Sequence, residues 1–130
     1  MATVTAKLTL TSSDLLSQNL NISVSKSATA SHTTGLARKK VAQTAVNANA
    51  ALLYTADDYA AIAYIYIKNT DTTATNYVYV YDDTTSGDPV ILKLAGGEFA
   101  FMPTNADKTL KAYGTNANTV VESMVFGTDQ

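Results

Sequence analysis

Strict alternation between apolar and polar residues is the feature that most constrains how this chain folds. Residues 3–11 alternate small or aliphatic side chains with threonines and one lysine, and residues 20–25 alternate in the same way. The apolar members of these segments are Val4, Ala6, Leu8, Leu10, Leu20, Ile22 and Val24. Successive side chains of an extended strand point to opposite faces, so a period of two predicts β-strands with one apolar face.

Similar runs continue to the end of the sequence. Residues 61–68 and 77–82 alternate tyrosines with aliphatic side chains. Shorter apolar runs follow at residues 90–94, 98–102, 110–113 and 119–126, the last two read as a hairpin. A total of about eight to nine short strands is typical of a sandwich, jelly roll or small barrel. We predict an all-β chain with a single domain over residues 1–130, either an antiparallel β-sandwich or a jelly-roll-like fold.

Three segments of the predicted domain need separate interpretation. Residues 1–10 form either a strand of the domain or an arm that contacts a neighbouring molecule. Residues 27–35 are small and polar, which predicts a loop. Residues 41–53 fit either one helical face or two strands with a break between them. We favour strands there, because the neighbouring segments are strands.

Composition and charge exclude several classes of function. Charged residues make up 15% of the 130 residues, against about 25% in ordinary globular domains, and the net charge is −2. A weakly negative chain is not expected to bind nucleic acid or an anionic membrane. The absence of cysteine excludes disulfides, thiolate metal sites and a cysteine nucleophile. The first residues lack a charged leader followed by an apolar run, so we expect no signal peptide.

The titratable residues do not form a recognisable catalytic set. The single histidine, His32, lies in the polar segment, and the two glutamates, Glu98 and Glu122, have no identifiable partner in the sequence. Residues 82–88 contain three aspartates, but their spacing does not match a calcium loop, so a turn is predicted instead. We therefore expect no enzyme activity, no metal site and no cofactor.

Two groups of residues are candidates for an interface. Five of the eight tyrosines lie in residues 61–68 and 77–82: Tyr64, Tyr66, Tyr77, Tyr79 and Tyr81. If these two strands pair, the rings form one array on one face of a sheet, which either binds a partner or covers the sheet. Arg38, Lys39 and Lys40 form the one basic run, which is either a contact for an acidic partner or a solvated edge.

The second half of the chain resembles a known class of proteins. The resemblance rests on Tyr64 to Thr70, on Gly96 to Pro103 with its turn and bulky apolar strand, and on the closing segment from Val120 to Gly127. In this pattern the chain is similar to small virion structural proteins of tailed bacteriophages. The resemblance covers about half the chain, from Ala60 to Gly127, and residues 1–59 have no counterpart in it.

The resemblance implies a structural role in a virion. We expect a capsid decoration or cement protein that binds and stabilises the head shell, with the major capsid protein or other virion proteins as partners. Such a protein is made in the host cytoplasm, carried in the virion, and expected to form a homo-oligomer, with a trimer as one form. The alternative is a neck, tail or spike component whose tyrosines stack on the sugar rings of a carbohydrate receptor.

Overall fold

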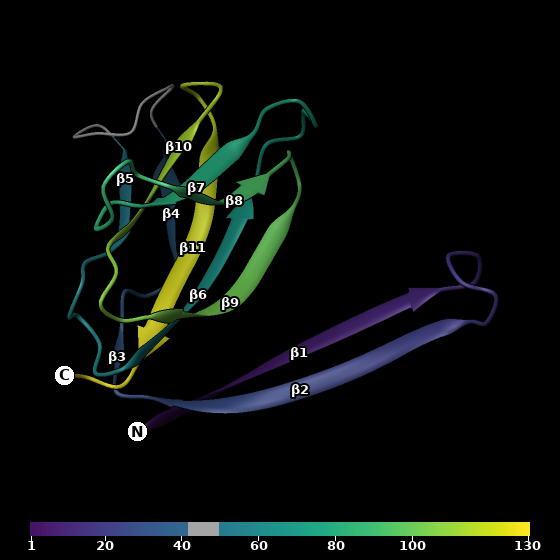
Figure 1. The fold of residues 1–130 in the computed structure, drawn as a ribbon, viewed down its shortest axis with the longest axis horizontal. Coiled ribbons are helices and arrows are strands. Elements are labelled where there is room, and N and C mark those ends of the chain that lie inside the picture. The colour runs from purple at the N-terminus through teal and green to yellow at the C-terminus, as the bar shows by residue number, and fades with distance from the viewer. Residues whose placement is uncertain (42–49) are drawn as a thin grey trace. The chain divides into compact units, whose positions relative to one another are not determined.

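A computed structural model describes residues 1–41 and 50–130, and this part of the chain is all-β (Figure 1). It contains eleven strands and no helix, which confirms the predicted class but exceeds the predicted number of strands. The chain divides into two compact units, Met1–Ala30 and Ser31–Gln130. The strands are β1 (Ala2–Ser12), β2 (Leu20–Ala30), β3 (His32–Thr33), β4 (Ala37–Lys40), β5 (Ala51–Tyr54), β6 (Ile62–Asn69), β7 (Val78–Asp82), β8 (Val90–Leu94), β9 (Phe99–Asn105), β10 (Leu110–Gly114) and β11 (Val120–Gly127).

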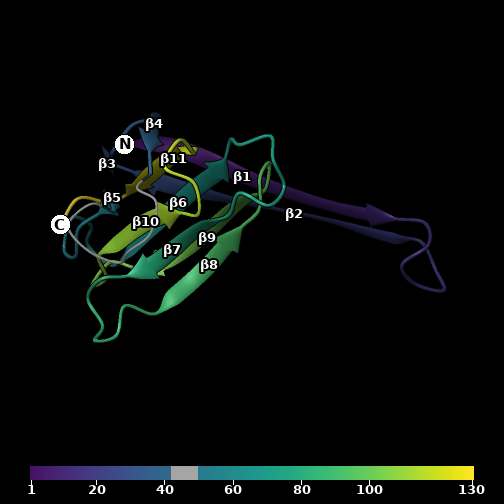
Figure 2. The same ribbon diagram turned by 90° about the horizontal axis from the view of Figure 1, so that it is seen from above.

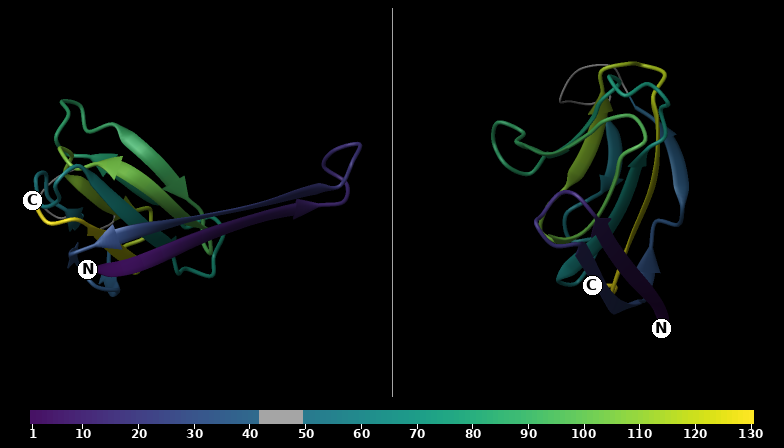
Figure 3. Two further views of the ribbon diagram at one scale, coloured as in Figure 1. Left: turned by 90° about the horizontal axis from the view of Figure 1, so that it is seen from below. Right: turned by 90° about the vertical axis from the view of Figure 1, so that its right-hand side faces the viewer.

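The first unit is a long antiparallel hairpin of β1 and β2, which form a twisted ribbon (Figures 2 and 3). All 11 residues of each strand pair, from Ala2 opposite Ala30 to Ser12 opposite Leu20, without a register shift. At the turn the Ser12 hydroxyl accepts hydrogen bonds from the backbone N–H of Asp14 and Leu15, at 3.3 and 3.0 Å. These bonds start the loop in the way short hydroxyl side chains often do.

The predicted polar loop over residues 27–35 is wrong in most of its length. Residues 27–30 complete β2, and His32 and Thr33 form β3 against β11. The chain is extended here although its side chains are small and polar. The reason is that the backbone hydrogen bonds between β2 and β1 form without the help of an apolar face. Beyond them, the hydroxyls of Thr33 and Thr34 both donate to the carbonyl oxygen of Val125, at 2.9 and 3.4 Å.

The second unit contains two antiparallel sheets. One has the strand order β5-β10-β7-β8, and the other has the order β3-β11-β6-β9, with β4 also paired to β11. Apolar side chains from both sheets form one core cluster, so the unit is of the β-sandwich class. The expected hairpin of residues 110–113 and 119–126 is wrong, because β10 and β11 lie in different sheets. The strand favoured within residues 41–53 is confirmed at β5, and residues 42–49 lie outside the described part.

The core is built from the aliphatic faces predicted by the alternation. Ala63, Ile65 and Ile67 of β6 are fully buried, as are Val78 and Val80 of β7. On β6 the intervening side chains Tyr64 and Tyr66 are only partly buried, in keeping with the period of two. The burial of alternate residues is therefore what joins the two sheets.

The turn between β7 and β8 is organised by a buried carboxylate. Asp82 is 7% exposed and accepts hydrogen bonds from the Thr84 N–H (2.8 Å) and the Thr85 hydroxyl (2.6 Å). The ammonium of Lys108 lies 3.2 Å from the same carboxylate. Burial alone would raise the pKa of Asp82, but the bonds from Thr85, Thr84 and Lys108 outweigh it and lower the pKa to about 2. The expected turn at residues 82–88 is thus confirmed, and its first aspartate is a structural residue.

We predict that Asp82→Asn lowers the free energy of unfolding at pH 7 by about 1–2 kcal/mol, because the charged form is the one the turn stabilises. Since the pKa is lowered in the folded state, this contribution is present above pH 4 and is lost as the pH falls towards 2. Urea unfolding at pH 7, 4 and 2 measures it. The exposed Asp107→Asn is the control, and a difference that persists unchanged at pH 2 would contradict this role.

Candidate interaction surfaces

Residues 61–68 and 77–82 do not pair, so the condition for a single array of the five tyrosines is not met. Strand β6 pairs with β9 and β11, whereas β7 pairs with β8 and β10 in the other sheet. Between them the chain crosses from one sheet to the other. Asn69, fully buried, fixes this crossing by donating through its amide to the carbonyl oxygens of Asn76 (2.7 Å) and Leu94 (3.1 Å). The tyrosines are therefore divided between the two sheets.

Tyr64 and Tyr66 lie on the outer face of the larger sheet, within a cluster of aromatic side chains. The Tyr64 ring stacks on Phe126 of β11, with centroids 5.3 Å apart, and on Phe101 of β9 at 6.2 Å. Phe126 is buried, but Phe101 is 41% exposed and Phe99, two residues earlier, is 64% exposed. This face thus presents apolar rings to solvent at its β9 side.

A polar group lies beside this aromatic cluster. The Tyr66 hydroxyl donates to Oε1 of Glu122 at 3.0 Å, and the guanidinium of Arg38 lies 3.2 Å from Oε2 of the same carboxylate. Burial, together with the bond to Glu122, raises the pKa of the Tyr66 hydroxyl, so this side chain stays neutral and donates. Glu122, for which the sequence offered no partner, therefore joins three strands: β4, β6 and β11.

The basic run does not form a single patch. Because β4 is an extended strand, Arg38 and Lys40 are exposed on one side and Lys39 is half-buried on the other. Arg38 pairs with Glu122, and the Lys39 ammonium donates to the carbonyl oxygen of Leu52 at 2.6 Å. Two of the three charges thus have partners within the second unit, which favours the solvated-edge interpretation over a docking site for an acidic partner.

The remaining tyrosines form a second aromatic group on the smaller sheet. Tyr79 of β7 stacks on Tyr113 of β10 with centroids 5.1 Å apart, and the Lys93 ammonium lies 4.0 Å from the centre of the Tyr77 ring. Tyr77, Tyr79 and Tyr113 are partly exposed. Tyr81 is fully buried, with the Tyr113 ring 5.7 Å away, so it is a packing residue and not an interface residue in this structure.

The hairpin carries six large aliphatic side chains that are exposed: Leu8, Leu10, Leu15, Leu16, Ile22 and Val24. Its first strand includes most of residues 1–10, for which an arm was one expectation, whereas no interface was predicted for β2. Its register places Leu8 opposite Val24 and Leu10 opposite Ile22, so one face of the ribbon is apolar. These four side chains are 41–56% exposed, and Leu15 and Leu16 in the turn are 70% and 55% exposed. The signal was present as two alternating segments in the sequence, but only the register shows that their apolar faces coincide.

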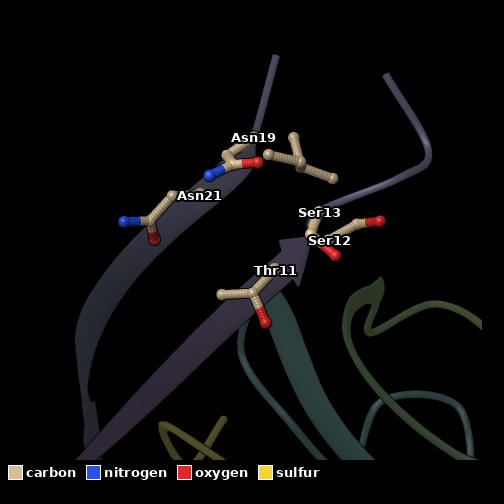
Figure 4. A pocket seen from close by; sticks show the side chains of 6 residues that line it. Thr11, Ser12, Ser13, Asn19 and Asn21 are labelled. Atoms are coloured by element: carbon tan, nitrogen blue, oxygen red, sulfur yellow. The ribbon is translucent and has the colours of Figure 1, made fainter. Parts of the chain in front are cut away.

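The turn of the hairpin also borders an open hollow of about 500 Å³ (Figure 4). Hydroxyl and amide side chains line it: Thr11, Ser12, Ser13, Asn19 and Asn21, together with Leu20. None of these groups is ionisable. The hollow therefore offers hydrogen bonds but no acid, base or charged metal ligand.

No cluster suited to binding a metal ion is found among residues 1–41 and 50–130, where no three His, Asp or Glu side chains come together. Within the same residues, no helix is long and apolar enough to cross a membrane. No protein-family model, curated protein or solved structure matches this chain.

We predict that Tyr81→Ser and Tyr79→Ser, two changes on the same strand, differ in their effect on folding. Loss of the buried ring should lower the free energy of unfolding by about 3 kcal/mol or more, because a cavity forms. Loss of the partly exposed ring should cost clearly less. Urea unfolding of both variants measures the difference, and equal losses would show that both rings are packing residues.

Proposed function

We propose that this chain is a non-enzymatic structural component of a phage virion, acting as a decoration or cement protein that binds and stabilises the head shell. The observation that carries the proposal is the hairpin, whose apolar face and turn leave six large aliphatic side chains exposed: Leu8, Leu10, Leu15, Leu16, Ile22 and Val24. The resemblance of residues 60–127 to small virion proteins supports the same assignment.

A hairpin of this kind suits an assembly protein. A two-stranded ribbon is marginally stable in water unless its apolar face is covered. Large exposed apolar patches on folded proteins mark interaction sites. On a symmetric shell, many copies of one such contact add up to firm attachment even when a single contact is weak. The apolar hairpin therefore supplies a contact through which copies can assemble on the shell, and this role needs no catalytic group.

The alternative proposal is a neck, tail or spike component that binds carbohydrate. Tyr79, Tyr113 and Tyr77 offer partly exposed rings, and aromatic rings can stack on the apolar faces of sugars. Against this role, Lys93 already covers the Tyr77 ring. A glycan array separates the two proposals, because a decoration protein should bind no glycan.

For the fold, the β-sandwich class is observed, and a jelly-roll-like arrangement of its strands stays a proposal.

The experiment that tests the proposed function is a count of this protein in purified particles from its source by quantitative mass spectrometry. We expect hundreds of copies per particle, since a decoration protein follows the lattice of the head. A count of about six to a few dozen would favour the neck, tail or spike alternative. Absence from the particles would contradict both virion proposals.

A further inference from the structure

We propose that the apolar face of the hairpin docks on the outer face of the larger sheet in a second copy of this chain. In the resulting closed assembly each copy both gives and receives one hairpin. This inference deepens the proposed function, because it assumes that the hairpin is an assembly element, and it names the partner of that element.

The donating surface lies on one face of the ribbon, whose Ala30 end is itself buried. Ten of its 12 residues are apolar in the observed register: Ala2, Val4, Ala6, Leu8, Leu10, Leu20, Ile22, Val24, Ala28 and Ala30. The other two are Ser12 and Lys26, whereas the opposite face carries only Thr, Ser, Asn and one Lys. Exposure is greatest at the two aliphatic pairs, Leu8 with Val24 and Leu10 with Ile22. The sequence has thus placed apolar and polar residues on separate faces although only a partner can benefit from the apolar one.

The receiving surface is the outer face of β11, β6 and β9. The register places Tyr66 between Met124 and Phe101, and Tyr64 between Phe126 and Pro103. Phe99 and Ile62 extend this face at its two ends and are 64% and 45% exposed. Glu122 and Lys68, which are directly opposite each other, mark the polar end beside Phe99. Between these ends the face is apolar and aromatic. Phe126 is buried and Tyr64 and Tyr66 are partly buried, so the exposed part of this face lies towards β9.

The two surfaces are similar in area but differ in shape. The ribbon has 11 residues per strand, which gives a face roughly 37 Å long and about 10 Å wide. Strands β6 and β11 have 8 residues each, so with β9 they give a face roughly 27 Å long and about 14 Å wide. Aligned along their strands, the two faces overlap over roughly 27 Å by about 10 Å, which is about 270 Å².

The buried area favours a closed assembly over a single contact between two hairpins. One contact buries about 540 Å² on both sides together, which is in the range of weak packing contacts. When two copies exchange hairpins, two such contacts join them and bury about 1,080 Å² in all. That value exceeds the usual range of packing contacts and approaches that of a standard stable interface, about 1,200–2,000 Å². Two hairpins that stacked only on each other would make a single contact and bury only the smaller area.

Net charge also favours docking of the hairpin on the second unit of another copy over docking of two hairpins on each other. Residues 1–30 carry Lys7 and Lys26 against Asp14, a net charge of +1. Residues 31–130 carry seven basic and ten acidic residues, a net charge of −3, and the two sums give the −2 of the chain. Two hairpins would repel each other weakly, whereas the hairpin and the second unit attract.

The smaller sheet is the less suitable receiver. Its outer side carries the ammonium groups of Lys93, over the Tyr77 ring, and Lys111, paired with Asp83 at 2.7 Å. The larger sheet instead presents Phe99, Phe101 and Ile62, with its charged residues Arg38, Lys40, Lys68 and Glu122 gathered at one end.

The test is the oligomeric state of the full chain, measured by light scattering and sedimentation over a range of concentrations. We expect a discrete oligomer for the unchanged protein. Leu8→Ser with Val24→Ser removes the donating surface, and Ile62→Ser with Phe99→Ser removes the receiving one. Each pair should raise the dissociation constant at least about tenfold. All four side chains are at least 45% exposed, so urea unfolding should show that both variants remain folded.

Matched controls lie on the faces that the proposal leaves free. Thr9→Ser with Ser23→Thr changes the polar face of the same hairpin, and Ile91→Ser removes a 45% exposed side chain from the smaller sheet. Both control variants should keep the oligomer. If they dissociate as readily as the test variants, the assignment of the two faces is wrong.

Mixing the two test variants gives the sharpest result. The variant changed at Ile62 and Phe99 keeps an intact hairpin, and the variant changed at Leu8 and Val24 keeps an intact receiving sheet. We expect the mixture to associate through the one remaining contact, more weakly than the unchanged protein, at concentrations at which neither variant associates alone. Association of either variant alone that equals that of the mixture would overturn the proposal, as would an unchanged protein that is monomeric at every concentration.

This result is independent of the count per particle. An oligomer of a protein absent from particles would leave the hairpin contact standing and contradict the virion role. A protein that is monomeric in solution but present in hundreds of copies per particle would support the virion role and contradict the proposed hairpin contact.

Discussion

Burial of alternate aliphatic side chains is the interaction on which the second unit depends. Each of the central strands β6, β7, β10 and β11 places every other residue in one shared core, and its remaining side chains stay on the outer faces. Most of these outer side chains take no part in the core, although Tyr81 and Phe126 are buried as well. Aromatic rings occupy both outer faces, with Tyr64 and Phe101 on one sheet and Tyr79 and Tyr113 on the other.

The hairpin follows the same rule of alternation but lacks a second sheet within its own unit. Its strands satisfy their backbone hydrogen bonds with each other, and its apolar face remains exposed at Leu8, Leu10, Ile22 and Val24. An apolar face of this length is costly to keep in water. We therefore place the assembly role in the hairpin and assign the buried Tyr81 and the paired Arg38 and Lys39 to the stability of the second unit.

The strands could be predicted from the sequence, but their partners could not. A period of two identifies an extended segment and its inner face, as it did for Ile65 and Ile67, because it depends only on neighbouring residues. Which strands pair depends on the connections, and the decisive one is held by a single buried side chain, Asn69. Tyr81 shows the same limit of sequence-based prediction. It alternates with aliphatic residues just as Tyr79 does, and only the neighbouring parts of the fold bury it. Residues 27–30 were predicted as a loop because they lack large apolar side chains in alternation. Their backbone pairing with β1 does not depend on such side chains.

The central claim is that the hairpin becomes stable only when a partner covers its apolar face. Hydrogen–deuterium exchange of the backbone amides of β1 and β2 tests it directly, with the protein free at low concentration and then assembled at high concentration. We expect fast exchange in the free hairpin and strong protection in the assembly, while protection of β6 and β11 changes little. Equal protection of the hairpin in both states would contradict it.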